Sequence, residues 1–314
     1  MIPILAERLA TAGSQGPGAP VLRILPETAR REREFSKRAA RILDVQGSDI
    51  MQYGFIGLGN MASAIIKGML HTQSFSPAAI HGYTPRPGNV ADFLKDTGIG
   101  FYPTLEELVA AVDVIVLAVK PQVLPSVLPG IAPLPLGDKL VISIAAGKPL
   151  AFFEEALGKN VAVARVMPNI NAKAGASTSA FTVNSQVTEP QKTAIQSMFA
   201  ATGSVMEIPE HLFPVFSAVA GAAPAFCYMY IDALARAGVR GGMPRKLALE
   251  AAASTVLGSA KMILESGEHP FSLIDQVTSP GGTTIEGICA LQRLGFESAV
   301  HQAVEAVINK DKLL

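Results

Sequence analysis

The chain has 314 residues, which is enough for two domains that each bury a core of their own. Its 26 basic and 26 acidic side chains cancel, so the charge gives no reason to expect nucleic acid or an anionic membrane as a partner. Hydrophobic residues make up 49% of the sequence, yet no stretch reaches the ~18–20 uninterrupted apolar residues of a membrane span. The longest candidate, residues 218–231, is too short and contains Pro224. We therefore expect the apolar excess to lie in helices that meet in an oligomer interface.

The cysteines and histidines do not form the pattern of a disulfide framework or a metal site. Cys227 and Cys289 lie in apolar helical contexts, and we interpret them as reduced core residues, which fits the cytoplasm. The five histidines, at positions 71, 81, 211, 269 and 301, lack metal-ligand spacing. The sequence therefore predicts no metal site.

Residues 1–50 differ in composition from the rest of the chain. Residues 11–20 are rich in Gly, Pro and Ser, and residues 27–43 form a charged stretch with helical character. A transit peptide would be rich in arginine but poor in acidic residues, and Glu32 and Glu34 argue against one. We interpret residues 1–50 either as a poorly ordered extension or as upstream sequence translated from a misassigned start.

A dinucleotide-binding fingerprint begins at the first confident strand, Tyr53–Ile56. The strand is followed by Gly57, Gly59 and Ala62 in the spacing G-x-G-x-x-A, and then by a helix through Leu70. In this fingerprint the first glycine makes the tight turn, and the second lets a pyrophosphate approach the backbone. The alanine lets the helix pack closely on the strand. The strand–turn–helix setting predicts that the chain binds a dinucleotide.

The end of the next strand, residues 79–83, indicates which dinucleotide is preferred. An NAD-specific site would place an acidic residue here to bind the ribose 2′-hydroxyl. Instead the chain has Thr84 and Arg86, and the first carboxylate is Asp92. A hydroxyl and a guanidinium suit a 2′-phosphate, so we predict NADPH, with NADH as the alternative. The competing interpretation of Arg86 is a solvated loop residue.

Helices and strands alternate up to about residue 210, as in an open α/β sheet. Buried strands are expected at residues 113–119, 139–144 and 161–166, with a helix over Leu105–Ala111. Residues 177–183 and 204–208 are expected to close the sheet as antiparallel strands. Ligands lie beyond the carboxyl ends of parallel strands. The residues at those ends that we expect to line the nicotinamide end are Lys120, Ala145, Ala146 and Asn169.

From residue 211 the pattern becomes helical only. Helices are expected at residues 213–238, broken or kinked at Pro224, and at residues 244–266, 270–277 and 296–309. Small residues near Pro224 would let helices pack closely, as in a dimer core. We therefore predict a Rossmann-type dinucleotide-binding domain of the α/β class over residues 51–210, followed by an all-α substrate-binding and dimerisation domain over residues 211–314.

A glycine loop at residues 279–284 precedes the helix that begins near Ile285. Pro280 fixes one backbone angle, and Gly281 and Gly282 let the main chain approach a ligand. The start of a helix offers free N–H groups and the positive end of the helix dipole. We interpret this loop as a receptor for a small carboxylate.

A hydride donor and a carboxylate receptor together predict a dehydrogenase or reductase. Reduction of a carbonyl needs a general acid such as His, Lys or Tyr, and the helical half offers none in an obvious constellation. A cyclic imine removes this requirement, because its nitrogen protonates readily and the iminium accepts hydride. A hydroxyl such as that of Thr284 then only has to hold the ring N–H.

Motifs along the chain resemble those of pyrroline-5-carboxylate reductases in their order. They are Gly57-x-Gly59-x-x-Ala62, Ala118-Val119-Lys120-Pro121, Ala145-Ala146-Gly147, Met167-Pro168-Asn169, Gly221-x-x-Pro224-Ala225-Phe226 and Ser279-Pro280-Gly281-Gly282-x-Thr284. The resemblance covers residues 51 to about 309. It implies NAD(P)H-dependent reduction of 1-pyrroline-5-carboxylate to L-proline, the last step of proline biosynthesis, by a homodimer that often assembles into decamers.

The resemblance also implies contacts for both ligands. Those with the cofactor fall on Ile56, Gly57, Leu58, Gly59, Asn60, Met61, Thr84, Arg86, Ala118, Val119, Lys120, Pro121, Ile144, Ala145 and Ala146. Those with the substrate fall on Glu210, Gln276, Ser279, Gly282, Thr283 and Thr284, with Thr284 as the catalytic residue.

The chain departs from the usual family pattern at a few positions, so alternatives stay open. Ala220 and Ala222 stand where family members usually have hydroxyl side chains, and Phe226 stands where they usually have a tyrosine. Thr104 and Gln276 each stand at a position where an Asn is frequent. The alternatives are a reductase of a related imine or β-hydroxyacid, and a weakly active NADP-binding regulatory paralogue. Residues 213–238 contain no lysine, which argues against a β-hydroxyacid enzyme, and the intact glycine loop argues against the paralogue.

Overall fold

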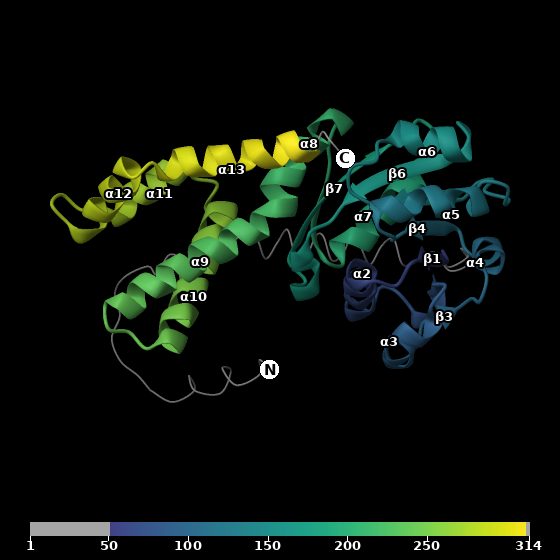
Figure 1. Cartoon of the computed structure of the whole chain (residues 1–314), viewed down its shortest axis with the longest axis horizontal. Helices are drawn as coiled ribbons and strands as arrows, with labels where there is room; N and C mark the ends of the chain where they lie inside the picture. Colours follow the sequence, from purple (N-terminus) through teal and green to yellow (C-terminus); the bar gives the residue numbers. More distant parts are fainter. Residues whose placement is uncertain (1–50, 312–314) are drawn as a thin grey trace, which may run out of the picture. The chain divides into compact units, whose positions relative to one another are not determined.

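An eight-stranded sheet organises the first half of the described chain (Figure 1). The structure is a computed structural model that describes residues 51–311, so the expectations for residues 1–50 lie outside the described residues. The strands are β1 (Tyr53–Ile56), β2 (Ile80–Tyr83), β3 (Gly100–Phe101), β4 (Val114–Leu117), β5 (Leu140–Ser143), β6 (Ala162–Met167), β7 (Ser177–Val183) and β8 (Gly203–Glu207). Their order in the sheet is β3-β2-β1-β4-β5-β6-β7-β8.

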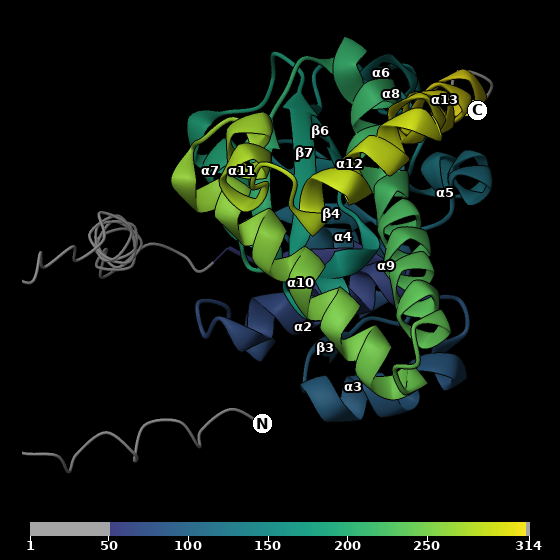
Figure 2. The same ribbon diagram turned by 90° about the vertical axis from the view of Figure 1, so that its left-hand side faces the viewer.

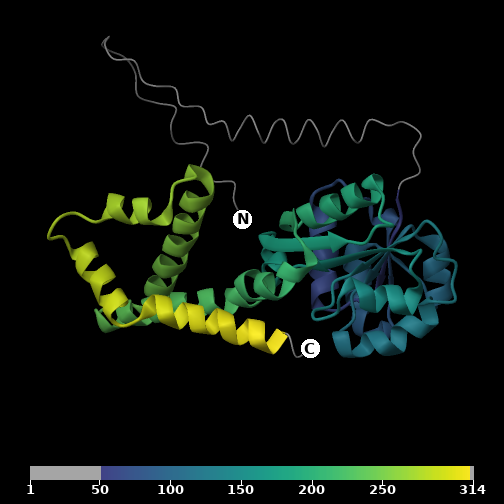
Figure 3. The same ribbon diagram turned by 90° about the horizontal axis from the view of Figure 1, so that it is seen from above.

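The helices of this half connect the strands and lie on the two faces of the sheet. They are α2 (Asn60–His71), α3 (Ala91–Thr97), α4 (Leu105–Ala111), α5 (Leu124–Ile131), α6 (Leu150–Leu157) and α7 (Glu189–Ala200). One buried cluster joins the sheet to α2 and α7 through residues such as Ile66 and Phe199, and the other joins it to α4, α5 and α6 through residues such as Leu108 and Phe153 (Figure 3). Both faces are covered, which explains why β1, β4 and β5 are apolar at almost every position.

The strand directions differ in one detail from the expectation. Strands β1 to β6 pair in parallel, and β7 is antiparallel to β6, as expected. Strand β8, however, pairs with β7 in parallel, because α7 carries the chain across the sheet between the two strands. Relative to the parallel strands, both closing strands therefore run in the opposite direction.

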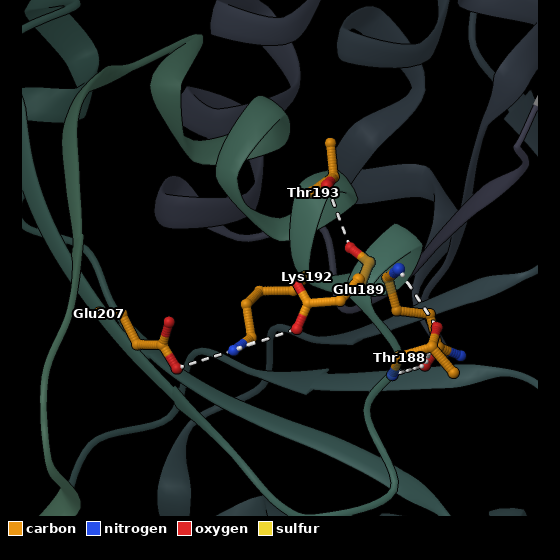
Figure 4. A network of polar contacts seen from close by, with 6 residues as sticks. Thr188, Glu189, Lys192, Thr193 and Glu207 are labelled. Carbon is orange, nitrogen blue, oxygen red and sulfur yellow. Dashed lines mark hydrogen bonds and ion pairs between the residues drawn. The ribbon is translucent and has the colours of Figure 1, made fainter. Parts of the chain in front are cut away.

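Polar contacts hold the first turn of helix α7 in place (Figure 4). Thr188 and Gln191 form a reciprocal capping box, and the Gln191 amide nitrogen donates to the Asp138 carbonyl oxygen at 2.8 Å. The Lys192 ammonium lies 3.2 Å from a Glu207 carboxylate oxygen at the end of β8. These contacts hold the crossover helix on β8, at the end of the sheet that leads into the helical half.

The second half consists of helices only. They are α8 (Phe213–Phe216), a π-helical segment (Ser217–Ala222), α9 (Ala223–Arg240), α10 (Arg245–Ser266), α11 (Pro270–Val277), α12 (Thr283–Arg293) and α13 (Phe296–Asp311). Helices α9 and α10 pack against each other (Figure 2) around a small cluster that includes Ala235 and Ala248. Asp232 accepts hydrogen bonds from Arg236 and from Arg245, which ties the two helices together.

The helical half leaves much apolar surface exposed, and this corrects two expectations. Cys227 and Cys289 are free thiols at exposed positions, not core residues, because the single chain does not cover the helix faces that carry them. Two stretches, Glu210–Arg240 and Arg245–Ser266, are long and apolar enough by length and composition to cross a membrane. The sequence analysis predicted helices here, but it considered only uninterrupted apolar runs and therefore did not identify either helix as a candidate span. Leu264, at 85% exposure, and Met229, at 77%, illustrate how little of this surface the chain itself buries.

Candidate functional site

The turn after β1 brings the backbone close to the ends of β2 and β4. Gly57 has φ +96°, a conformation that favours glycine, and its N–H donates to the Tyr83 carbonyl oxygen at 2.8 Å. A Cβ atom at position 57 would lie 2.9 Å from the Ala118 carbonyl oxygen. The first glycine of the fingerprint is therefore required by the fold itself.

Gly59 has a different surrounding. It caps the N-terminus of α2 with extended backbone angles, and the part of the chain that the structure describes provides no side-chain cap hydrogen bond there. A Cβ built on Gly59 would meet no atom within 4 Å. The open space beside a twelve-residue helix whose first N–H groups are not capped by a side chain fits a dinucleotide pyrophosphate.

The carboxyl ends of the parallel strands meet at one edge of the sheet. Strand β1 lies between β2 and β4, so the strand order reverses between β1 and β4, and a crevice at that point is the usual place for a dinucleotide. The residues that the sequence predicts to contact the cofactor follow the ends of β1, β2, β4 and β5. The structure brings these four segments together: 56–61, Thr84 with Arg86, 118–121, and 144–146.

Thr84 and Arg86 follow the end of β2, next to the glycine turn. The Arg86 side chain is exposed, and its backbone N–H lies 3.5 Å from the Thr84 hydroxyl oxygen. The first acidic residue beyond them is Asp92, in the first turn of α3. A hydroxyl and an unshielded guanidinium at this point are the groups expected to bind a phosphate on the ribose.

Asn169 follows the end of β6, and its side-chain amide is hydrogen-bonded within the protein. Its side chain is buried, with 5% exposure, and its amide oxygen accepts from the Asn171 N–H at 3.1 Å. Its amide nitrogen donates to the Ala220 carbonyl oxygen in the π-helical segment at 3.0 Å. The structure thus gives Asn169 a partner in the helical half, and its expected position beside the nicotinamide stays a prediction.

Glu210, which is expected to contact substrate, is hydrogen-bonded to the protein through one of its two carboxylate oxygens. One carboxylate oxygen, Oε1, accepts from the Leu150 N–H at 2.7 Å and lies 3.4 Å from Nη1 of Arg165. Its second oxygen, Oε2, makes no hydrogen bond with any residue of the described chain. Glu210 can therefore hold its position through Oε1 and still present Oε2 to a ligand.

Arg165 is the residue that sequence reasoning missed. It lies in β6 with 6% exposure, and its guanidinium stacks over the Phe213 ring at 4.3 Å. Burial lowers the pKa of Arg165, and the charge of Glu210 opposes that lowering. Its Nε atom has no hydrogen-bond partner within residues 51–311. A charged residue inside the otherwise apolar stretch 161–166 was the available signal.

The glycine loop forms a tight turn at the start of α12. The Gly282 N–H donates to the Ser279 carbonyl oxygen at 2.9 Å, and Gly281 has φ +69° after Pro280. Proline followed by a left-handed glycine is the pattern of a type II turn. A Cβ at position 282 would lie 2.4 Å from the Ser279 hydroxyl oxygen, so this hydroxyl lies over the last residue of the turn.

The start of α12 has the properties of a carboxylate receptor. Gly282 is its cap, and within residues 51–311 this helix start has no side-chain cap hydrogen bond. Thr283 and Thr284 are exposed in that turn. Gln276, near the end of α11, donates through its amide nitrogen to a Glu268 carboxylate oxygen at 2.6 Å, which leaves its amide oxygen for a ligand.

The predicted residues thus form two groups within the described chain. The cofactor residues lie at the sheet edge, and Ser279, Gly282, Thr283 and Thr284 lie together at the start of α12. No hydrogen bond or ion pair between described residues connects this loop with the sheet edge. Residues 51–311 also contain no group of three or more His, Cys, Asp or Glu that could hold a metal ion.

Two family models match the sequence, one in each half. Residues 52–147 match the family described as NADP oxidoreductase, coenzyme F420-dependent. Residues 210–314 match the family described as pyrroline-5-carboxylate reductase dimerisation. The second match begins at the residue where the chain leaves the sheet.

Curated relatives and solved structures agree with these matches. The pyrroline-5-carboxylate reductase of Escherichia coli is 40% identical over 261 residues, which cover 83% of this chain and 97% of the relative. The structure of the Plasmodium falciparum pyrroline carboxylate reductase with NADP bound has a TM-score of 0.76 and 32% identity, over 85% of this chain and 99% of that chain. The structure of the Coxiella burnetii enzyme has a TM-score of 0.79 and 30% identity, over 84% and 98%.

Proposed function

The chain belongs to the pyrroline-5-carboxylate reductase family, and from this premise we propose that it reduces 1-pyrroline-5-carboxylate to L-proline with a nicotinamide dinucleotide. The observation that carries the proposal is the presence of two complementary sites in one chain. A glycine turn with open space at Gly59 suits a dinucleotide, and a glycine loop at the uncapped start of α12 suits a small carboxylate. The reaction would be the last step of proline biosynthesis.

NADPH is the proposed cofactor. The open space at Gly59 and the helix start behind it fit the pyrophosphate, and Thr84 and Arg86 fit a 2′-phosphate. When bound, the cofactor supplies the hydride. The segments 118–121 and 144–146, which follow β4 and β5, are proposed to hold the nicotinamide end, with Lys120 exposed at the first of them. NADH remains the alternative cofactor, with weaker binding because it has no phosphate for Arg86.

The substrate residues are proposed to bind and orient a cyclic iminium. The N–H groups at the start of α12, together with the Ser279 hydroxyl, would bind the carboxylate. The Thr284 hydroxyl would accept from the protonated ring nitrogen, with Glu210 Oε2 and the Gln276 amide oxygen as further acceptors. Because the imine nitrogen protonates readily, the protein contributes mainly proximity and orientation, which can supply about 7–11 kcal/mol.

We propose that a second copy of the chain covers the exposed helices. The match of residues 210–314 to the dimerisation family supports a dimer rather than a membrane as the partner of the two apolar helical stretches. A dimer would also let the glycine loop of one subunit face the sheet edge of the other, since no hydrogen bond or ion pair between described residues connects them in one chain. The functional division would then be residues 51–210 for the cofactor and 211–314 for substrate and dimerisation, in a cytoplasmic enzyme that can assemble further.

Oxidation of NADPH by the purified protein tests the proposal. We expect absorbance at the reduced nicotinamide band to fall with 1-pyrroline-5-carboxylate as substrate and to stay constant with 2-oxoacids. A six-membered cyclic imine carboxylate is the comparison that separates a related imine reductase, because Ala220, Ala222 and Phe226 differ from the usual pattern. Turnover of only the larger ring, or of none of these compounds with the cofactor bound, would contradict the proposal.

A further inference from the structure

Pro224 creates a defect in the helix that leads out of the sheet. In an α-helix the N–H of a residue donates to the carbonyl oxygen four positions earlier, and proline has no N–H to donate. In regular α-helical geometry this would leave the carbonyl of Ala220 without a donor. In this chain the Ala220 oxygen receives a hydrogen bond from the Asn169 amide nitrogen at 3.0 Å instead. The side chain of Asn169 therefore supplies this carbonyl with a donor from outside the helix.

The helix also changes its geometry at this point. Residues Ser217–Ala222 are π-helical, and α9 begins at Ala223 with Pro224 in its first turn. A proline ring collides with the carbonyl four residues earlier, and the wider π turn makes room for it. Such π segments occur frequently at functional sites. The π-helical segment thus has one local cause, Pro224, and one external support, Asn169.

Asn169 is itself held firmly at the end of β6. Its amide oxygen accepts from the Asn171 N–H at 3.1 Å, and its own N–H donates to the Ser177 hydroxyl at 3.2 Å. The neighbouring Asn171 accepts a hydrogen bond from the Tyr228 hydroxyl on α9 at 3.3 Å. The turn after β6 therefore holds the helix on both sides of Pro224, at Ala220 and at Tyr228.

We propose that Asn169 is a positioning residue for hydride transfer. The carboxyl end of β6 belongs to the edge of the sheet that carries the cofactor segments, and α9 begins the half that carries the substrate loop. By holding the π-helical segment at Ala220, the Asn169 amide sets the direction in which the helical half leaves the sheet, and so the distance between the two ligands in the dimer. This inference rests on the proposed reductase function.

The test uses variants that separate the donor from the rest of the residue. Asn169→Asp keeps an acceptor for the Asn171 N–H but cannot donate to Ala220. Asn169→Ser adds no charge, and its hydroxyl ends one bond short of the position from which the Asn169 amide nitrogen donates to Ala220. Asn171→Asp adds the same charge two residues away and still accepts from Tyr228, so it is the matched control. Pro224→Ala restores a main-chain N–H that can donate to the Ala220 carbonyl.

In the full-length enzyme we expect kcat to fall by about 10- to 100-fold for both Asn169 variants, because a misplacement of about 1 Å can cost about 100-fold. The KM for NADPH should stay near the wild-type value, and the isotope effect with NADPH deuterated at the transferred position should rise. The double variant Asn169→Ser with Pro224→Ala should be more active than Asn169→Ser alone. Unchanged kcat, or losses that multiply in the double variant, would overturn the proposal.

Hydrogen exchange gives a readout that does not depend on turnover. Backbone amides of residues 217–226 should exchange faster in Asn169→Ser, those of β1 and α2 should not, and Pro224→Ala should restore part of the protection. Equal protection in wild type and Asn169→Ser would overturn the role of the Asn169 amide even in a protein without reductase activity. If exchange changes as expected but the wild type does not reduce 1-pyrroline-5-carboxylate, the proposed function fails, and with it the positioning of hydride transfer.

Discussion

Nη1 of Arg165 and Oε1 of Glu210 lie 3.4 Å apart and join the last parallel strand to the first turn of the helical half. The two residues differ in burial: the Arg165 side chain is 7% exposed and that of Glu210 is 33% exposed. The pair also holds α6, because the same Glu210 oxygen accepts from the Leu150 N–H. One ion pair thus connects three elements at the point where the chain leaves the sheet.

This difference in burial predicts unequal effects of mutation on stability. Glu210→Gln leaves a buried guanidinium without its counter-charge, and we expect it to lower the free energy of unfolding by about 1–3 kcal/mol. Arg165→Met leaves a carboxylate that water can reach, and the methionine fills the space over Phe213. It should therefore lower the free energy of unfolding by less than Glu210→Gln does. Urea unfolding of both variants and of the double variant measures this. A larger loss for Arg165→Met than for Glu210→Gln would contradict the assignment.

The two glycines of the first turn should respond differently to alanine. Gly57→Ala places a Cβ 2.9 Å from the Ala118 carbonyl oxygen at a positive φ, so we expect a loss of stability of about 1–3 kcal/mol. Gly59→Ala meets no atom within 4 Å and should fold normally, but its methyl group should obstruct the pyrophosphate and weaken NADPH binding. Thermal unfolding without ligand and NADPH titration separate the two effects. Equal stability losses would contradict this reading of the turn.

Much of the sheet half could be predicted because its signals are local. The apolar strands before Gly57 and before Lys120 have the composition of strands that are covered on both faces. The glycine spacing places a tight turn directly after the first of these strands. The helix boundaries at α4 and α11 agree with the sequence prediction because a capping Thr104 and a first-turn Pro270 mark them. Family membership and the reductase fold are likewise confirmed.

What could not be predicted depends on contacts between distant residues. The hydrogen bond from Asn169 to Ala220 spans 51 positions, and the local sequence around neither residue predicts it. The prediction that Cys227 and Cys289 are core residues was wrong, because an apolar helix face is equally suited to a core and to an interface between subunits. The individual cofactor and substrate contacts remain predictions.

Arg86→Ala should change the choice between the two nicotinamide cofactors. A hydrogen bond to a charged group contributes about 1.5–3 kcal/mol, so we expect the KM for NADPH to rise about 10- to 100-fold. The KM for NADH should hardly change, because NADH lacks the phosphate. Arg86→Lys keeps the charge but not the planar pair of donors, so its KM for NADPH should lie between those of the wild type and Arg86→Ala. An unchanged ratio of the two KM values would remove Arg86 from phosphate binding.

His81 should make the protein less stable at mildly acidic pH. Its ring lies between Gln52, whose side-chain oxygen is 2.9 Å from Nε2, and Tyr102, and burial lowers the pKa of His81 in the folded chain. The unfolded chain, with a His pKa of about 6.5, then binds more protons as the pH falls below that value. Stability is therefore full above about pH 6.5 and decreases below it.

The comparison of His81→Gln with wild type isolates this contribution from the other titrating groups. Between pH 7.5 and 5.5 the urea midpoint of the wild type should fall further than that of His81→Gln. His71→Gln, which alters an exposed histidine at the end of α2, is the matched control and should follow the wild type. Parallel pH profiles for wild type and His81→Gln would contradict the prediction.

Thr284→Ala should lower turnover and leave NADPH binding unchanged. Thr284 lies in the first turn of α12, where its hydroxyl is exposed beside the glycine loop and remote in sequence from every cofactor segment. If the hydroxyl holds the ring N–H of the iminium, its loss removes a hydrogen bond to a charged group, so kcat should fall about 10- to 100-fold. Thr284→Ser should recover most of the activity and Thr284→Val should not, because only serine keeps the hydroxyl. If Thr284→Val were as active as the wild type, the hydroxyl would have no part in the reaction, and the loop would act through its main-chain N–H groups alone.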